Sequence, residues 1–87
     1  MSTKFLQSYL YTDFGTFFVS TCYRESSAVL SDTWYYETFA WKLEDGKRTD
    51  WVADNSGANN KEGAIEQHIE VCRELYKNGK YEVNNEQ

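Results

Sequence analysis

Apolar and polar residues alternate along the first two thirds of the chain in a way that predicts two β-hairpins. β-Branched and aromatic residues recur without helical spacing over 4–11 and 16–24, and Asp13, Phe14 and Gly15 separate the two runs. Two further runs cover 33–43 and 47–53, and Asp45-Gly46 between them suits the positive φ angles of a tight turn. The small and polar segments 25–32 and 54–60 are expected to be loops.

The pattern changes to a helical period after residue 60. A rotation of about 100° per residue gathers most apolar side chains between 61 and 78 on one arc, with the charged ones opposite. Asn59 with Glu62, or Asn60 alone, is expected to cap the start of this helix, and Gly79 its end. Tyr81 and Val83 are candidates for a short edge strand.

These elements predict an α+β fold: a four-stranded antiparallel meander of two hairpins with one C-terminal helix packed on one face. A chain of 87 residues has room for one core. We therefore expect a single domain over 1–83 and a frayed tail over 84–87.

Strand alternation also assigns side chains to the two faces of the sheet. Pairing Tyr11 with Thr16 groups Leu6, Leu10, Phe17, Val19 and Tyr23 on one face and Phe5, Tyr9, Tyr11, Phe18 and Cys22 on the other. Pairing around Asp45-Gly46 puts Phe39 opposite Val52, with Trp41 and Leu43, and leaves Trp34, Tyr36, Ala40 and Trp51 on the reverse. Because aliphatic side chains suit a dry core, we expect the helix on the side of Leu6, Phe17, Val19, Phe39 and Val52.

One helix can cover one side of a four-stranded sheet, so the other side is expected to expose aromatic rings. Aromatic residues make up 17% of the chain, which favours a surface that binds something. The candidate binding residues are Tyr9, Tyr11, Phe18, Trp34, Tyr36 and Trp51. They predict a non-catalytic module that binds a protein partner, most simply a second copy in a homodimer. In the alternative, the 25–32 loop and the tail fold over these rings and no site exists.

Charge narrows the choice of partner. Nine basic against fourteen acidic residues give a net charge of -5, which argues against binding to nucleic acid. Glutamates recur at every fourth position on the helix and form a carboxylate ridge of Glu62, Glu66, Glu70 and Glu74. This ridge supports a second hypothesis, an acidic inhibitor or nucleic-acid mimic, although we favour a solvated face as its explanation.

The sequence gives little support to catalysis or metal binding. His68 and Cys72 lie one helical turn apart, and Cys22 is the one other soft ligand, so a zinc site would be incomplete. We favour a packed His68 with one ring nitrogen hydrogen-bonded, and two free thiols. No enzyme activity, metal or cofactor is expected. No apolar run reaches membrane-spanning length, so we expect no membrane partner and a cytoplasmic location.

The segment from Trp34 to Trp41 (WYYETFAW), followed by the helical segment from Glu62 to His68 (EGAIEQH), resembles a class of small uncharacterised tailed-bacteriophage proteins. The shared features are an aromatic-Glu-Thr strand, a charged hairpin, and a helix that carries Glu-x-Ala and then His. The resemblance implies a phage or environmental origin, in a host cytoplasm, and an accessory role in binding a host or phage component. It supplies no catalytic residues.

Overall fold

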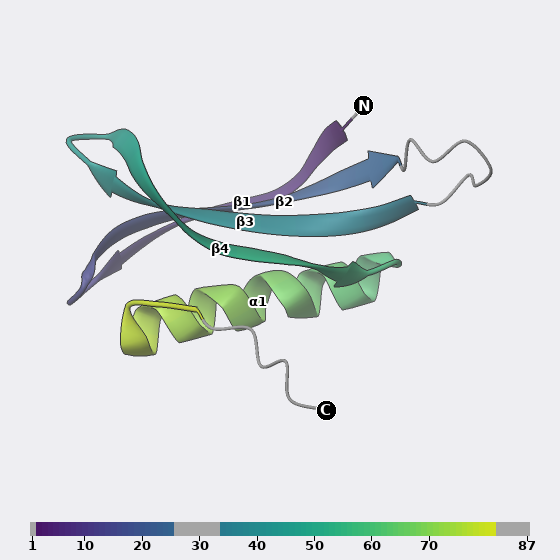
Figure 1. Ribbon diagram of the computed structural model, residues 1–87. Helices are drawn as coiled ribbons and strands as arrows, with labels where there is room; N and C mark the ends of the chain where they lie inside the picture. Colours follow the sequence, from purple (N-terminus) through teal and green to yellow (C-terminus); the bar gives the residue numbers. More distant parts are fainter. Residues whose placement is uncertain (1, 26–33, 82–87) are drawn as a thin grey trace.

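The computed structural model describes residues 2–25 and 34–81. Within them, four strands form one antiparallel sheet in the order β1-β2-β3-β4, and a helix lies along one face of it (Figure 1). The elements are β1 (Ser2–Thr12), β2 (Gly15–Glu25), β3 (Trp34–Glu44), β4 (Lys47–Ala58) and α1 (Lys61–Asn78). The predicted α+β meander is confirmed. Residues 26–33, Val83 and the 84–87 tail lie outside the described residues, and Tyr81 belongs to no strand.

Both hairpins turn where the sequence predicts. In the first, Tyr11 pairs with Thr16, and the Thr12 hydroxyl accepts the Phe14 N–H at 2.9 Å and donates to the Gly15 carbonyl at 2.9 Å. In the second, Asp45 and Gly46 have φ angles of 55° and 79°, the left-handed backbone that a two-residue turn needs.

Helix α1 has the predicted bounds and caps. The Asn60 side chain accepts the Gly63 N–H at 2.7 Å, so Asn60 is the N-terminal cap. Gly79 has a φ of 75° and donates its N–H to the Leu75 carbonyl at 2.9 Å. A Cβ at Gly79 would lie 2.6 Å from the ring of Phe14, so this end of the helix packs tightly against the first hairpin turn.

Strand β4 is longer than predicted, because the 54–60 segment is not a loop over its first five residues. Asn55 pairs with Thr38 of β3, and Ala58 pairs with Tyr36. The Gln67 side-chain oxygen also accepts the N–H groups of Gly57 and Ala58, at 3.1 and 3.0 Å. A side chain from the helix therefore replaces a missing neighbour strand, which local composition does not reveal.

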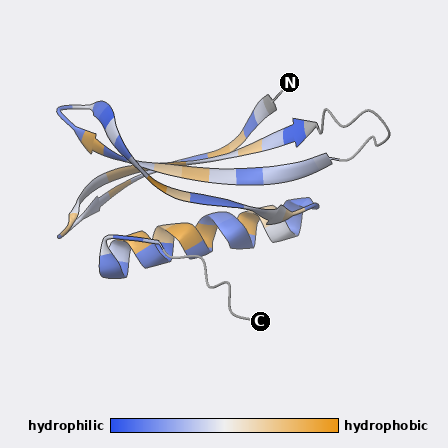
Figure 2. Cartoon of the chain, viewed as in Figure 1, coloured by the Kyte–Doolittle hydropathy of each residue, from blue (hydrophilic) through white to orange (hydrophobic). Residues whose placement is uncertain are grey.

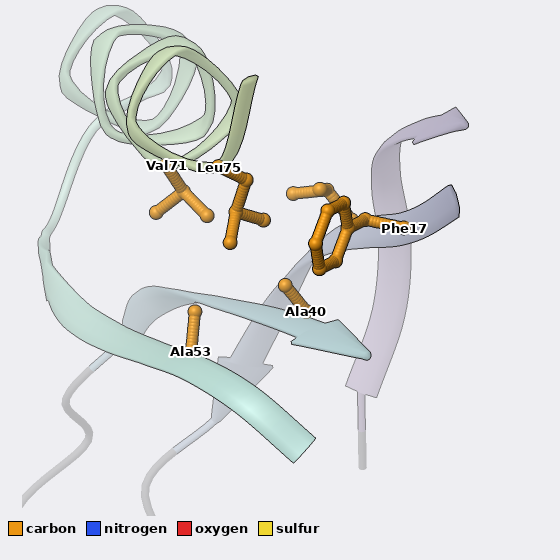
Figure 3. Close-up of a cluster of buried hydrophobic side chains, with 6 residues drawn as sticks. Phe17, Ala40, Ala53, Val71 and Leu75 are labelled. Atoms are coloured by element: carbon orange, nitrogen blue, oxygen red, sulfur yellow. The ribbon is translucent and has the colours of Figure 1, made fainter. Parts of the chain in front are cut away.

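The hydrophobic core lies between α1 and the sheet. It is built from Phe17 and Val19 of β2, Ala40 of β3, Ala53 of β4, and Val71 and Leu75 of α1 (Figure 3). Hydrophobic residues are interspersed with polar ones on the helix as well as the strands (Figure 2). The small side chains at 40 and 53 leave room for Val71 and Leu75 to approach the sheet.

The predicted faces are right for the first hairpin, apart from Phe5, and for Trp51 and Val52 of β4, but they are inverted for β3. Ala40 is in the core, so its neighbours Phe39 and Trp41 point to the face opposite the helix, hereafter the open face. Phe39 pairs with Asp54, not with Val52, which stands in an irregularity and packs against the core from the edge. The prediction chose the bulkier side chains for the core, whereas the helix selects the smaller ones.

Two breaks in strand register move further rings. Between Lys4 and Leu6 the register of β1 shifts, and the Phe5 ring lies 5.1 Å from that of Tyr36, which shares a face with Thr38 and Ala40. Between Ala40 and Trp41 the register of β4 shifts, so that Trp51 pairs with Trp41 on the open face.

Candidate binding face

Four aromatic side chains cross the open face in a line, one from each strand. Tyr9 pairs with Phe18, Phe18 with Trp41, and Trp41 with Trp51. The ring centroids are 4.9 Å apart between Tyr9 and Phe18, and 6.0 Å between Phe18 and Trp41. These four residues are called the aromatic row.

The two ends of the aromatic row are exposed and its middle is covered. Tyr9 and Trp51 are 58% and 61% exposed, whereas Phe18 is 7% exposed. The Arg48 guanidinium lies over the rings of Phe18 and Trp41, 5.2 and 4.4 Å from their centroids. Arg48 thus contributes a cation to the open face and shields the central rings through cation–π contacts.

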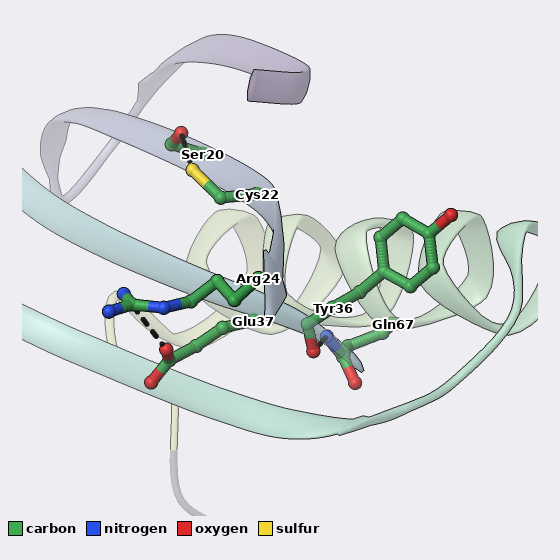
Figure 4. Close-up of polar contacts among 6 residues, drawn as sticks. All are labelled: Ser20, Cys22, Arg24, Tyr36, Glu37 and Gln67. Carbon is green, nitrogen blue, oxygen red and sulfur yellow. Dashed lines mark hydrogen bonds and ion pairs between the residues drawn. The ribbon is translucent and has the colours of Figure 1, made fainter. Parts of the chain in front are cut away.

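Acidic groups also lie on the open face, on the side of the aromatic row opposite Arg48. Arg24 and Glu37 form an ion pair at 3.2 Å, with the helix behind the sheet (Figure 4). Burial raises the pKa of Glu37 above its ordinary value, as do a hydrogen bond with Asp54 and the charge of that carboxyl, while Arg24 lowers it. The neighbouring Asp54 carboxyl therefore favours the protonated form of Glu37, and Arg24 offsets part of this effect.

A cavity of about 280 Å³ opens where the second hairpin turn approaches β1. Its lining consists of Tyr9, Tyr11, Thr16, Leu43, Asp45 and Gly46. The cavity is continuous with the aromatic row through Tyr9, and it combines rings with one carboxylate. It has the size of a pocket for a side chain of a partner, not for a large cofactor.

Four of the six predicted binding residues share the open face: Tyr9, Tyr11, Phe18 and Trp51. Trp34 and Tyr36 do not, because they belong to the helix-facing side of β3. The Trp34 ring stacks on the Tyr23 ring with the two centroids 4.9 Å apart, and the centroid of the Tyr36 ring lies 4.7 Å from that of Tyr23.

Sequence reasoning missed Phe39, Trp41 and Arg48 as members of the open face. The alternation within each hairpin was visible, but the pairing between β2 and β3 was not. That pairing decides which side of the second hairpin continues the aromatic face of the first.

Beneath the helix, a buried polar network surrounds His68. Its Nε2 lies 2.8 Å from the Ser8 hydroxyl and its Nδ1 lies 2.7 Å from the Thr21 hydroxyl. Thr21 and Thr38 are 2.6 Å apart, and the Gln67 amide nitrogen donates to Thr38 at 2.9 Å. His68 is a packed residue as expected, but both ring nitrogens are hydrogen-bonded, not one.

The Gln67 side chain determines which group donates in each hydrogen bond of this network. Its side-chain oxygen accepts two backbone N–H groups, so its NH₂ must donate to Thr38. The Thr38 proton then points to Thr21 and the Thr21 proton to Nδ1 of His68, which leaves the ring proton on Nε2. Burial also lowers the pKa of His68, so a neutral imidazole that donates to Ser8 fits both observations.

Cys72 lies beside this network, and burial raises the pKa of its thiol while a hydrogen bond with Ser8 lowers it. Both cysteines are free thiols, as predicted. In the described ranges, 2–25 and 34–81, no three His, Cys, Asp or Glu residues are placed to hold a metal ion. A raised thiol pKa disfavours the thiolate that a nucleophile needs.

The carboxylate ridge lies on the solvent side of α1. Glu62, Glu66 and Glu70 are exposed, while Glu74 is half-buried and accepts the Asn78 amide at 2.8 Å. The ridge and the aromatic row occupy opposite sides of the molecule, since the helix and the open face flank the sheet. The two predicted sites are therefore separate surfaces.

None of the helical segments among the described residues combines the length and apolar character that crossing a membrane requires.

The chain matches no protein-family model, and comparison with curated proteins and with solved structures finds no match.

Proposed function

We propose that this chain is a non-catalytic binding module that docks onto another protein through its open face. The observation that carries the proposal is the exposure of Tyr9 and Trp51, at 58% and 61%, on the face opposite the core. Aromatic rings of about 150–250 Å² each that stay in contact with water are unfavourable in a solitary chain and favourable in an interface.

The chemistry of the open face suits a protein partner better than a nucleic acid. Tyr, Trp and Arg are the side chains most enriched at the energetic centres of protein interfaces, and Trp51, Tyr9 and Arg48 supply all three. Platforms that stack single-stranded nucleic acid pair their rings with many cations. Here the carboxyls of Glu37 and Asp54 share the face, and the net charge is -5.

An accessory role fits this proposal. The resemblance to small tailed-phage proteins implies a chain that binds a host or phage component, and we extend that role to the open face. Two free thiols, at Cys22 and Cys72, are compatible with the reducing cytoplasm in which we expect it to act.

Site-specific photo-cross-linking tests the proposal. A benzophenone amino acid is placed at Tyr9 on the open face and, as a matched control, at Tyr76 on the helix, which is 61% exposed. The two variants are irradiated as purified chains at high concentration and in extracts of cells that express them. We expect protein adducts from position 9 and few from position 76. Equal yields, or no adduct from position 9, would contradict the proposal.

A further inference from the structure

The residues on either side of the aromatic row form two matched lines across the sheet. The first line crosses β3 two residues before Trp41 and consists of the register partners Gln7, Ser20, Phe39 and Asp54. The second line crosses β3 two residues after Trp41 and consists of Tyr11, Thr16, Leu43 and Arg48. The row therefore lies midway between an acid at one side and a base at the other, both on β4.

We propose that two copies of this chain pack open face to open face, related by a two-fold axis that runs along the aromatic row. This inference rests on the proposed function and names the partner as a second copy. Such an axis keeps each strand opposite its own equivalent and reverses the strand direction. The axis thereby places the line of Tyr11, Thr16, Leu43 and Arg48 on one copy opposite the line of Gln7, Ser20, Phe39 and Asp54 on the other copy.

Between these two lines, the contacts that this symmetry creates join complementary side chains. Arg48 faces Asp54 of the second copy, and Leu43 faces Phe39. Tyr11 faces Gln7, and Thr16 faces Ser20, so each polar group meets another polar group. A long arginine and a short aspartate together can bridge the about 10 Å between facing sheets. In the single copy the Arg48 guanidinium already lies on this face, over Phe18 and Trp41.

The area of the face is sufficient for a stable pair. Four strands of 11 or 12 residues present a surface of about 700 Å² at ordinary strand spacings. A standard protein interface covers about 800 Å² on each partner. The cavity lined by Tyr9, Tyr11 and Leu43 would receive the Gln7 side chain of the second copy.

Charge also selects a second copy over an unrelated partner. On β4 the open face carries Arg48 on one side of the row and Asp54 on the other, so this part of the face is complementary to itself when turned end to end. An isologous dimer requires this kind of self-complementary patch. Two Arg48–Asp54 contacts form in each pair because the symmetry creates each contact twice.

Charge exchange tests the arrangement. Arg48→Glu and Asp54→Arg each bring like charges together twice, and each is expected to weaken self-association at least tenfold in sedimentation equilibrium. The double variant R48E/D54R restores opposite charges and is expected to return the dissociation constant to within about threefold of the original. Lys61→Glu on the exposed start of α1 makes the same change in net charge as Arg48→Glu and is the matched control.

Circular dichroism and urea midpoints check that all four variants fold, since Arg48 and Asp54 are exposed. A double variant as monomeric as the single ones, or single variants that associate like the original chain, would overturn the arrangement. A chain that stays monomeric at every concentration also overturns it. In that case adducts between position 9 and another protein would still support the proposed function, whereas no adduct would remove both.

Discussion

The two faces of the sheet cover their side chains in different ways. On the helix-facing side, Val19 and Ala40 are fully buried under Val71 and Leu75. On the open face, larger rings lie in a row whose two ends remain half in water, and Arg48 shelters the middle. Bulk and aromatic character therefore do not decide burial here. Large rings occur on both faces, since Phe17 lies in the core and Tyr36 is buried on the helix-facing side. The faces differ in their cover, which is α1 on one side and the Arg48 side chain on the other.

The largest expected effect is a difference in the free energy of unfolding between substitutions on the two faces. Leu75→Ala removes a fully buried side chain and leaves a cavity, so we expect the free energy of unfolding to fall by about 2–5 kcal/mol. Trp51→Ala removes a larger but exposed side chain and is expected to cost less than about 1 kcal/mol. Urea denaturation at low protein concentration measures both. A larger loss from Trp51→Ala than from Leu75→Ala would reverse the assignment of the faces.

The second effect concerns the polar part of the helix-facing side. Gln67→Ala leaves the N–H groups of Gly57 and Ala58 without their acceptor and is expected to destabilise the fold by about 1–3 kcal/mol. Hydrogen exchange at these two amides is expected to accelerate. Glu66→Ala, an exposed neighbour on the helix, is the control, and similar exchange in both variants would show that Gln67 does not hold the end of β4.

Sequence alone predicts the elements well and their relative orientation poorly. The helix from 61 to 78, its caps at Asn60 and Gly79, and the Asp45-Gly46 turn all depend on neighbouring residues, and all are confirmed. The face of the second hairpin depends on contacts between residues far apart in the chain, such as Val19 with Ala40. The register shift near Val52 acts the other way, because one extra residue returns Trp51 to the open face, where the sequence predicts it, although β3 is inverted.

Strand β4 illustrates the same limit. The composition of 54–58 is that of a loop, and Gln67, nine or ten residues away in the chain, keeps its last residues bonded. The candidate site was accordingly predicted in part. Tyr9, Tyr11 and Phe18 come from the hairpin whose alternation is regular, while Trp34 and Tyr36 were assigned to the wrong side.

A third effect sharpens the description of the buried network through pH. Burial depresses the pKa of His68, so the unfolded chain, with a pKa of about 6.5, binds this proton more tightly than the folded one. The contribution of His68 to stability is therefore complete above a pH of about 6.5 and is lost as the pH falls through the lower pKa of the folded state.

Nitrogen NMR of the imidazole ring measures this directly. We expect a neutral ring at pH 7 with the proton on Nε2, and a pKa below that of a histidine in a short peptide. A ring with its proton on Nδ1 would contradict the direction assigned to the Gln67–Thr38–Thr21 chain.

The smallest effect tests the acidic side of the open face. Because the pKa of Glu37 is raised, its contribution to stability is complete below a pH of about 4.3 and is lost as the pH rises through the folded pKa. Asp54→Asn removes one neighbouring charge, so we expect the Glu37 pKa to move down toward its ordinary value. Carbon NMR of the Glu37 carboxyl follows the shift, and Glu44→Gln is the control. An unchanged titration would show that Asp54 does not act on Glu37.

Hydroxyl-radical footprinting at increasing protein concentration tests most directly whether the open face is the docking surface. It compares exposed rings on the two sides of the sheet: Tyr9 and Trp51 on the open face, Trp34 and Tyr76 on the helix-facing side and the helix. We predict that oxidation of Tyr9 and Trp51 falls as the concentration rises, while oxidation of Trp34 and Tyr76 stays constant. Protection of Trp34 and Tyr76 with Tyr9 and Trp51 unchanged would contradict the account.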